Sequence, residues 1–117
     1  VMKTSSFKDL IVWQKAYALV LEIYRIIKNF PNAEVYGLAH QMRKSAVSVP
    51  SNIAEGYGRK HKTEYSQFLS IAYGSLAELE TQYLLAVDLE YAAKNEVVEN
   101  LLKEVGGMLY RMLNPAN

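Results

Sequence analysis

The side chains best suited to chemistry lie in the middle of this 117-residue chain, between His40 and Lys62. Five of them are cationic, and Glu55 is the only acidic residue in the segment. Cationic side chains at a loop and a helix end, with Tyr57 and Tyr65 on either side of the loop, can contact phosphates and stack on bases. The pattern predicts a candidate nucleic-acid-binding surface made of Arg43, Lys44, Arg59, Lys60 and Lys62.

The same segment shows no pattern typical of a metal site or a catalytic centre. His40 and His61 lie in different predicted elements, and neither has further ligands at zinc-like spacing. Serines recur at every third position from Ser45 to Ser51, but no base is near them in sequence. A structural role beside Pro50 explains these serines better than nucleophilic catalysis does. We therefore expect no metal, no cofactor and no enzymatic activity.

Composition is typical of one folded domain, expected to span residues 1–117, because half the residues are apolar and 21% are charged. There is no cysteine, which excludes disulfides and thiolate metal sites and fits a reducing compartment. The apolar run Ala16–Leu21 is too short for a membrane span or a signal-peptide core. We expect a cytoplasmic protein with no membrane partner.

Charge is unevenly distributed along the chain although its net value is only +1. Near-neutrality argues against a globally basic nucleic-acid binder. The segment from residue 78 to residue 104 opposes only Lys94 and Lys103 to a set of acids: Glu78, Glu80, Asp88, Glu90, Glu96, Glu99 and Glu104. One interpretation is that this acidic segment and the basic one neutralise each other when packed; the other is that the cations bind a ligand.

If the two predicted central helices fold back on each other near residue 60, specific polar side chains come close enough to interact. Arg43 would then pair with Glu78 or Glu80, which would remove it from any binding surface. Asn52 and Glu55 would fix the end of their own helix through hydrogen bonds, as buried polar groups require. We therefore assign structural polar roles to Asn52, Glu55, Glu78 and Glu80.

Apolar residues recur at steps of three and four through most of the chain, which is typical of helices. The predicted helices cover approximately residues 8–29, 34–57, 63–91 and 96–113. Ser6, Thr63 and Asn95 are candidate N-caps of the first, third and fourth helices. The first helix carries two adjacent apolar stripes, wider than one bundle core needs, so its surplus is expected to face a partner subunit.

Pro50 lies inside the second predicted helix, where a proline removes one backbone hydrogen bond and costs about 3 kcal/mol. The apolar stripe stays in phase on both sides of Pro50, which favours one kinked helix. The alternative is a break, with Asn52 capping a new turn and Glu55 completing a capping box. The third helix has a strict four-three apolar seam, and Gly74 within it indicates close packing. These patterns together predict an all-α, up-down-up-down antiparallel four-helix bundle.

Several segments also resemble those of a known family: Phe7–Ala16, Tyr36–Leu38, Gln41–Gly56, Gly58–Arg59 and Phe68–Thr81. The chain is similar to the four helix bundle protein family, also labelled S23, whose members are encoded in intervening sequences of bacterial 23S ribosomal RNA genes. The resemblance spans about residues 6 to 113. One departure is Lys44, where arginine is expected about as often.

The resemblance implies an antiparallel bundle that assembles as a ring, commonly a homopentamer. It also implies kinship with the accessory variability determinant protein of diversity-generating retroelements, a basic pentamer that binds nucleic acid and a reverse transcriptase. It supplies no enzymatic activity and no catalytic residues. The leading hypothesis is a homo-oligomeric scaffold that contacts RNA or a ribonucleoprotein through its basic loop end. The alternative is a protein-interaction scaffold with no nucleic-acid role.

Overall fold

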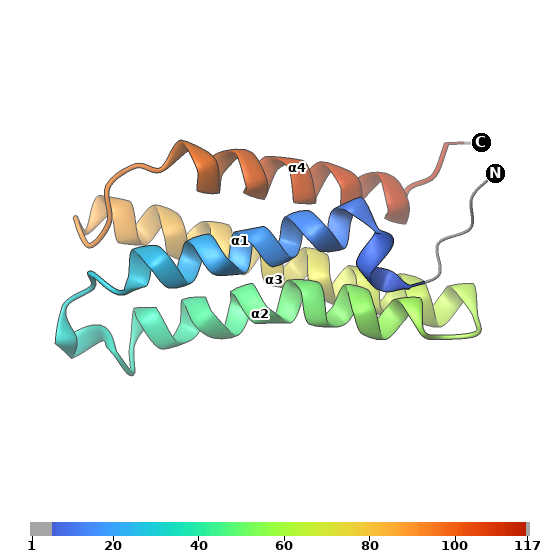
Figure 1. The fold of residues 1–117 in the computed structure, drawn as a ribbon, viewed down its shortest axis with the longest axis horizontal. Helices are drawn as coiled ribbons and strands as arrows, with labels where there is room; N and C mark the ends of the chain where they lie inside the picture. Colours follow the sequence, from blue (N-terminus) through green and yellow to red (C-terminus); the bar gives the residue numbers. More distant parts are fainter. Residues whose placement is uncertain (1–5, 117) are drawn as a thin grey trace.

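Four helices run alternately up and down in the computed structural model, which describes residues 6–116 (Figure 1). Each helix packs against two neighbours, so that α1 and α3 both contact α2 and α4. The described part of the chain begins and ends at the same end of the bundle as the α2–α3 connection (Figure 1). The helices are α1 (Ile11–Ile27), α2 (Leu38–Tyr57), α3 (Lys62–Asp88) and α4 (Glu96–Leu113), with short 3₁₀ helices η1 (Phe7–Asp9) and η2 (Asn32–Glu34).

The all-α, up-down-up-down prediction is confirmed, and residues 6–116 contain no strand. The predicted domain of residues 1–117 also includes residues 1–5 and 117, which lie outside the described part of the chain. Residues 6–116 form one bundle with one contiguous core.

One apolar stripe of each helix forms that core. In α1 the fully buried stripe runs through Ala16, Leu19 and Ile23, whereas its neighbour remains partly outside, with Tyr17 50% exposed. The surplus apolar face predicted for α1 is therefore present. The largest fully buried side chains of the other helices are Met42, Val49, Ile53, Leu79, Tyr83, Val98, Val105 and Leu109.

Helix starts differ from prediction where a side chain or a backbone angle intervenes. α1 begins at Ile11, because Leu10 is extended (φ −73°, ψ 125°) and separates it from η1. Ser6 caps η1 by accepting from the Lys8 N–H, and not α1. α2 begins at Leu38, because Glu34 Oε1 accepts from the Leu38 N–H at 2.9 Å.

Of the N-caps predicted for the third and fourth helices, only that of the fourth is found. α3 begins at Lys62 with His61 at the N-cap position, so Thr63 lies inside the helix and the predicted cap is wrong. α3 ends at Asp88, and Glu90 follows with a positive φ of 63°. Asn95 caps α4, as predicted, because its Oδ1 accepts from the Val98 N–H at 3.0 Å.

α2 passes through Pro50 without interruption, so the alternative of two separate helices is wrong. The kink at this position stays a prediction. Pro50 is buried, and packing offsets the missing backbone hydrogen bond. Ser48, expected to have a structural role beside Pro50, instead contacts α3, because its hydroxyl lies 2.7 Å from that of Ser75.

Two glycines show opposite surroundings. A Cβ at Gly56 would lie 2.8 Å from the Phe68 Cβ and 2.9 Å from Tyr65 Cδ1, so this glycine lets α2 and α3 approach closely. Gly74 is exposed, and no atom lies within 4 Å of its added Cβ. The packing expected at Gly74 is therefore not found within this chain.

Candidate functional surfaces

The α2–α3 connection is an exposed basic loop of Arg59, Lys60, His61 and Lys62. Arg59 is held in place, because its Nη2 lies 3.3 Å from Glu55 Oε2 and its guanidinium lies 4.9 Å from the centre of the Phe68 ring. Lys60 and Lys62 make no ion pair with any described residue. One anchored arginine is therefore followed by two exposed lysines.

The other two predicted nucleic-acid residues lie elsewhere. Arg43 is sixteen residues before Arg59 on α2 and its continuation, which places them about 24 Å apart along the helix axis. Arg43 and Lys44 therefore do not join the loop in one surface. Only the loop residues stay together at one end of the bundle.

The predicted ion pair of Arg43 with Glu78 or Glu80 is wrong. Arg43 Nη2 instead donates to the Val35 carbonyl at 3.0 Å, so the guanidinium stabilises the turn before α2. Asn52 Nδ2 donates to Ser48 O at 2.8 Å and to Ser48 Oγ at 3.0 Å, one turn earlier in α2. Glu55 is exposed and pairs with Arg59.

The two ends of the bundle differ in charge among residues 6–116. The loop end carries Lys8, Arg59, Lys60, Lys62 and Arg111 against Asp9, Glu55 and Glu64. The opposite end, where α3 connects to α4, carries Asp88, Glu90, Glu96 and Glu99 near Glu34, against Lys28 and Lys94. No described ion pair joins the basic segment to the acidic one, so the predicted mutual neutralisation does not occur through direct contacts.

A polar groove of about 430 Å³ lies between α2 and α3, lined by residues 40–48 of α2 and residues 75–82 of α3. Gln82 is only 6% exposed, and its Oε1 is buried without a hydrogen-bond donor; Ser45 is 5% exposed. Every side chain that lines this polar groove is polar: His40, Gln41, Lys44, Ser45, Ser48, Ser75, Glu78 and Gln82.

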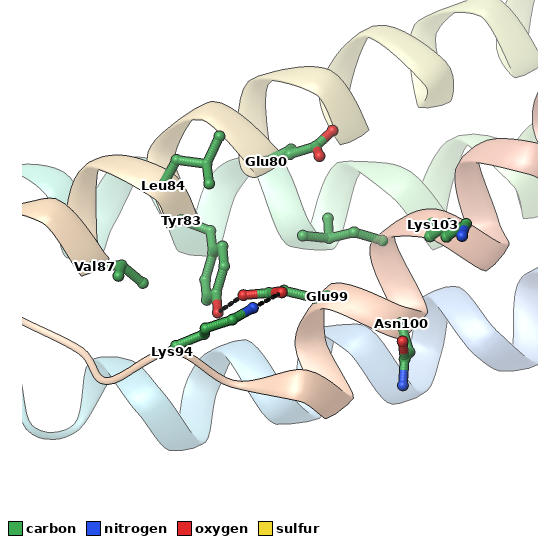
Figure 2. Close-up of a pocket in the computed structure, with 9 residues that line it drawn as sticks. Glu80, Tyr83, Leu84, Val87, Lys94, Glu99, Asn100 and Lys103 are labelled. Carbon is green, nitrogen blue, oxygen red and sulfur yellow. Dashed lines mark hydrogen bonds and ion pairs between the residues drawn. The ribbon is translucent and has the colours of Figure 1, made fainter.

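The pocket between α3 and α4 is larger, about 610 Å³, and contains a closed hydrogen-bond network (Figure 2). The Tyr83 hydroxyl donates to Glu99 Oε2 at 2.9 Å, and Lys94 pairs with the other oxygen of Glu99 (Figure 2). The hydrogen bonds from Lys94 and Tyr83 lower the pKa of Glu99, whereas burial raises the pKa of Tyr83. Each of these polar groups has a partner, so the network stabilises the start of α4.

An apolar groove of about 390 Å³ runs between α1 and α2 on another face. Its rim includes Leu21 and Val47, which are exposed. The residues that line this apolar groove are Trp13, Tyr17, Val20, Leu21, Val47, Pro50, Ser51 and Ala54. Exposed apolar side chains gathered in one groove are typical of a surface that packs against a partner.

The model of one protein family, described as 23S rRNA-intervening sequence protein, matches residues 8–111. The chain belongs to this family. A crystal structure from Bacteroides thetaiotaomicron, of a protein with unknown function from the S23 ribosomal protein family, has the same fold as this 23S rRNA-intervening sequence protein family member. The TM-score is 0.76 at 22% identity, over 89% of this chain and 99% of that one. A search of curated proteins found no match.

Within the part of the chain that the structure describes, no three potential ligands among His, Asp and Glu gather at a metal-binding distance in this family member. No helix of that part is long and apolar enough to span a bilayer. Sequence reasoning missed Gln82 because it lies beside Tyr83 of the apolar seam and looks like a surface residue. The sequence signal for the polar groove is the pair Ser45 and Ser48, whereas Ser51 of the same repeat lines the apolar groove.

Proposed function

We propose that this protein is a non-enzymatic, homo-oligomeric helical scaffold that binds RNA through its α2–α3 loop. The observation that carries the proposal is the arrangement of Arg59, Lys60 and Lys62. The arginine is oriented by Glu55 and Phe68, and the two exposed lysines have no acidic partner among the described residues. Phosphates are the natural partners of such a cluster, because arginine and lysine neutralise them at a helix end.

Oligomerisation strengthens this surface. The apolar groove on α1 and α2 supports packing against a second copy, and the resemblance to the S23 proteins supports a ring, commonly of five subunits. In a ring whose axis runs along the bundles, the α2–α3 loops of all subunits gather at one end. A modest cluster on each subunit then becomes a continuous band of positive charge.

A protein-interaction scaffold without RNA is the second candidate. Two observations favour it: the net charge is only +1, and Glu55 already neutralises Arg59. In this case the apolar groove contacts another protein, and the loop is a solvated end of the bundle. The two candidates differ in what the loop lysines do, so they can be separated by changing those lysines alone.

The test is binding to structured RNA, titrated against salt, for the wild type and a Lys60→Glu/Lys62→Glu variant. We expect tight binding that weakens steeply with salt, and a salt slope reduced by about 0.7 to 0.9 for each lost phosphate contact. The matched control is Lys28→Glu/Lys103→Glu, which changes net charge equally at exposed positions outside the loop.

Solution mass is measured in the same buffer for all three proteins. The proposal is supported if the loop variant loses RNA while the control binds and all keep the same mass. Absence of binding at low salt by an intact oligomer would overturn RNA binding and leave the interaction scaffold.

A further inference from the structure

The polar groove between α2 and α3 is not explained by the bundle fold or by RNA binding at the loop. Helix seams in bundles are normally apolar, because a polar group taken from water must find a partner. Here two polar side chains, Ser45 and Gln82, are more than nine-tenths buried beside the groove. The Gln82 Oε1 accepts no hydrogen bond from any described residue. Such an orphan group needs an explanation.

Charges of opposite sign face each other across this groove. Ser48 and Ser75 touch at 2.7 Å, which fixes the register of the two antiparallel helices. One turn further along, Lys44 lies on α2 and Glu78 lies on α3, so the two charges are at the same level. No described ion pair joins them, and both side chains are exposed at the mouth of the groove.

We propose that this groove binds a small zwitterion, an α-amino acid or a molecule with the same pair of charged groups. Lys44, with the Ser45 hydroxyl, receives the carboxylate, and Glu78 receives the ammonium. The amide of Gln82 completes the site. A half-turn about its last bond exchanges its oxygen and nitrogen, so it presents an acceptor to the ammonium or a donor to the carboxylate.

The lining restricts the class of ligand. No phenylalanine, tyrosine or tryptophan lines the groove, so a nucleobase or a sugar ring would find only the exposed His40 imidazole to stack on. No aliphatic side chain lines it either, which disfavours lipids and apolar peptides. The volume of about 430 Å³ lies within the range typical of small-molecule sites, roughly 300–1,000 Å³.

The experiment measures binding of individual small L-amino acids, glycine, serine and asparagine among them, to the intact protein by calorimetry and by thermal unfolding. Each is compared with the amine that lacks its carboxylate and with the hydroxy acid that lacks its ammonium. We expect only the zwitterions to bind and to raise the midpoint of thermal unfolding. Equal binding of the hydroxy acids would overturn the proposal in favour of a plain anion site, and no binding at millimolar concentration would overturn it altogether.

Near-isosteric variants locate the site. Lys44→Met and Glu78→Gln should each weaken binding by about ten- to a hundred-fold, the range expected for one charge-assisted hydrogen bond. The matched controls, Lys103→Met and Glu80→Gln, remove the same charges from exposed positions outside the groove and should bind as the wild type does.

A direct contact between the two charges is the competing explanation. A double-mutant cycle on Lys44 and Glu78, measured by urea unfolding without ligand, reports that contact. The effects of the two substitutions on the free energy of unfolding should be additive if Lys44 and Glu78 do not contact each other in the free protein. A strong coupling between them, together with no amino-acid binding, would show that the groove is closed by an ion pair. Because RNA binding depends on Lys60 and Lys62, this test and the test of the proposed function can fail separately.

Discussion

The Tyr83 hydroxyl oxygen lies 2.7 Å from the backbone nitrogen of Asn95, the residue that caps α4. The hydroxyl accepts from that N–H and donates to Glu99, so one buried side chain of α3 fixes both the cap and the first turn of α4. A backbone N–H at this position would otherwise be left without a partner. This tyrosine therefore ties α3 to the first turn of α4, beside the buried apolar face that packs α4 on the bundle.

Tyr83→Phe should lower the free energy of unfolding by about 1–3 kcal/mol, because it leaves the Asn95 N–H and one Glu99 oxygen without their partner. The ring stays in the core, so no cavity forms. Urea unfolding measures the change. Tyr110→Phe is the control, since Tyr110 is exposed on α4 and makes no side-chain hydrogen bond given by the structure; an equal loss in both variants would contradict the role assigned to Tyr83.

Glu99 gives the protein a specific acid sensitivity. Its pKa is lowered from the ordinary 4.5 by hydrogen bonds from Lys94 and Tyr83. A carboxyl group with a lowered folded-state pKa stabilises the protein above its unfolded pKa, and this contribution is lost as the pH falls through the folded value. Glu99→Gln should therefore be less stable than the wild type at pH 7, with a difference that shrinks below pH about 4.5.

The measurement is the free energy of unfolding of both proteins from pH 7 to pH 2. Glu96→Gln, one turn before on the exposed surface of α4, is the matched control. A difference between wild type and Glu99→Gln that stays constant with pH would contradict the assignment, because a lost shape or packing contact does not titrate.

Glu34 joins two connections at the acidic end of the bundle. Its Oε1 accepts from the Leu38 N–H, and its Oε2 lies 3.3 Å from the Tyr91 hydroxyl after α3. Glu34→Ala should cost about 0.5–2 kcal/mol of stability, the range for loss of a helix cap. Tyr91→Phe removes only the second contact and should cost less. If Tyr91→Phe costs as much as Glu34→Ala, then the cap of α2 contributes little.

These examples show which features the sequence could predict. Burial along one helix repeats with the helical period, so Ala16, Leu19 and Ile23 could be recognised as a core face without neighbours. Asn95 could be recognised as a cap because its partner is three residues away. The first residues of α1 and α2 could not be recognised in this way. α1 starts after Leu10 because the backbone of Leu10 is extended, and α2 starts at Leu38 because the side chain of Glu34 reaches its N–H from four residues away.

The candidate sites depend on distances between side chains of different helices, which a sequence pattern does not contain. Arg43 was expected to reach α3, but a carbonyl in the preceding turn lies closer. The basic residues looked like one cluster in sequence, but a continuous α2 separates Arg43 from the loop. The polar groove exists because the register that brings Ser48 to Ser75 also places Ser45 and Gln82 along the same seam between α2 and α3.

The two glycines with opposite surroundings predict opposite effects of one substitution. Gly56→Ala should destabilise the protein, because its Cβ would meet the Phe68 Cβ at 2.8 Å and neither backbone can yield cheaply. Gly74→Ala should stabilise a monomer by about 0.5–1 kcal/mol, because alanine favours the helix and the space is open. Both are measured by urea unfolding together with solution mass. A loss of mass for Gly74→Ala would show that a neighbouring subunit approaches this glycine.

The apolar groove predicts where a second copy packs. Leu21→Glu/Val47→Glu places two charges on its exposed rim, where both side chains are more than two-fifths open to solvent. The bundle itself should remain folded, since neither residue belongs to the buried core. Assembly should fall to the monomer, because a charge desolvated at an interface costs more than the contact returns.

Analytical ultracentrifugation measures the mass, and circular dichroism confirms the helix content. Val97→Glu, a similarly exposed apolar residue on α4, is the control and should leave the mass unchanged. An unchanged mass in the Leu21→Glu/Val47→Glu variant would show that copies meet through another face. A folded, monomeric variant also tests whether RNA binding needs the oligomer. If the loops bind RNA only when several subunits present them together, the RNA affinity of this variant should fall although Lys60 and Lys62 are intact.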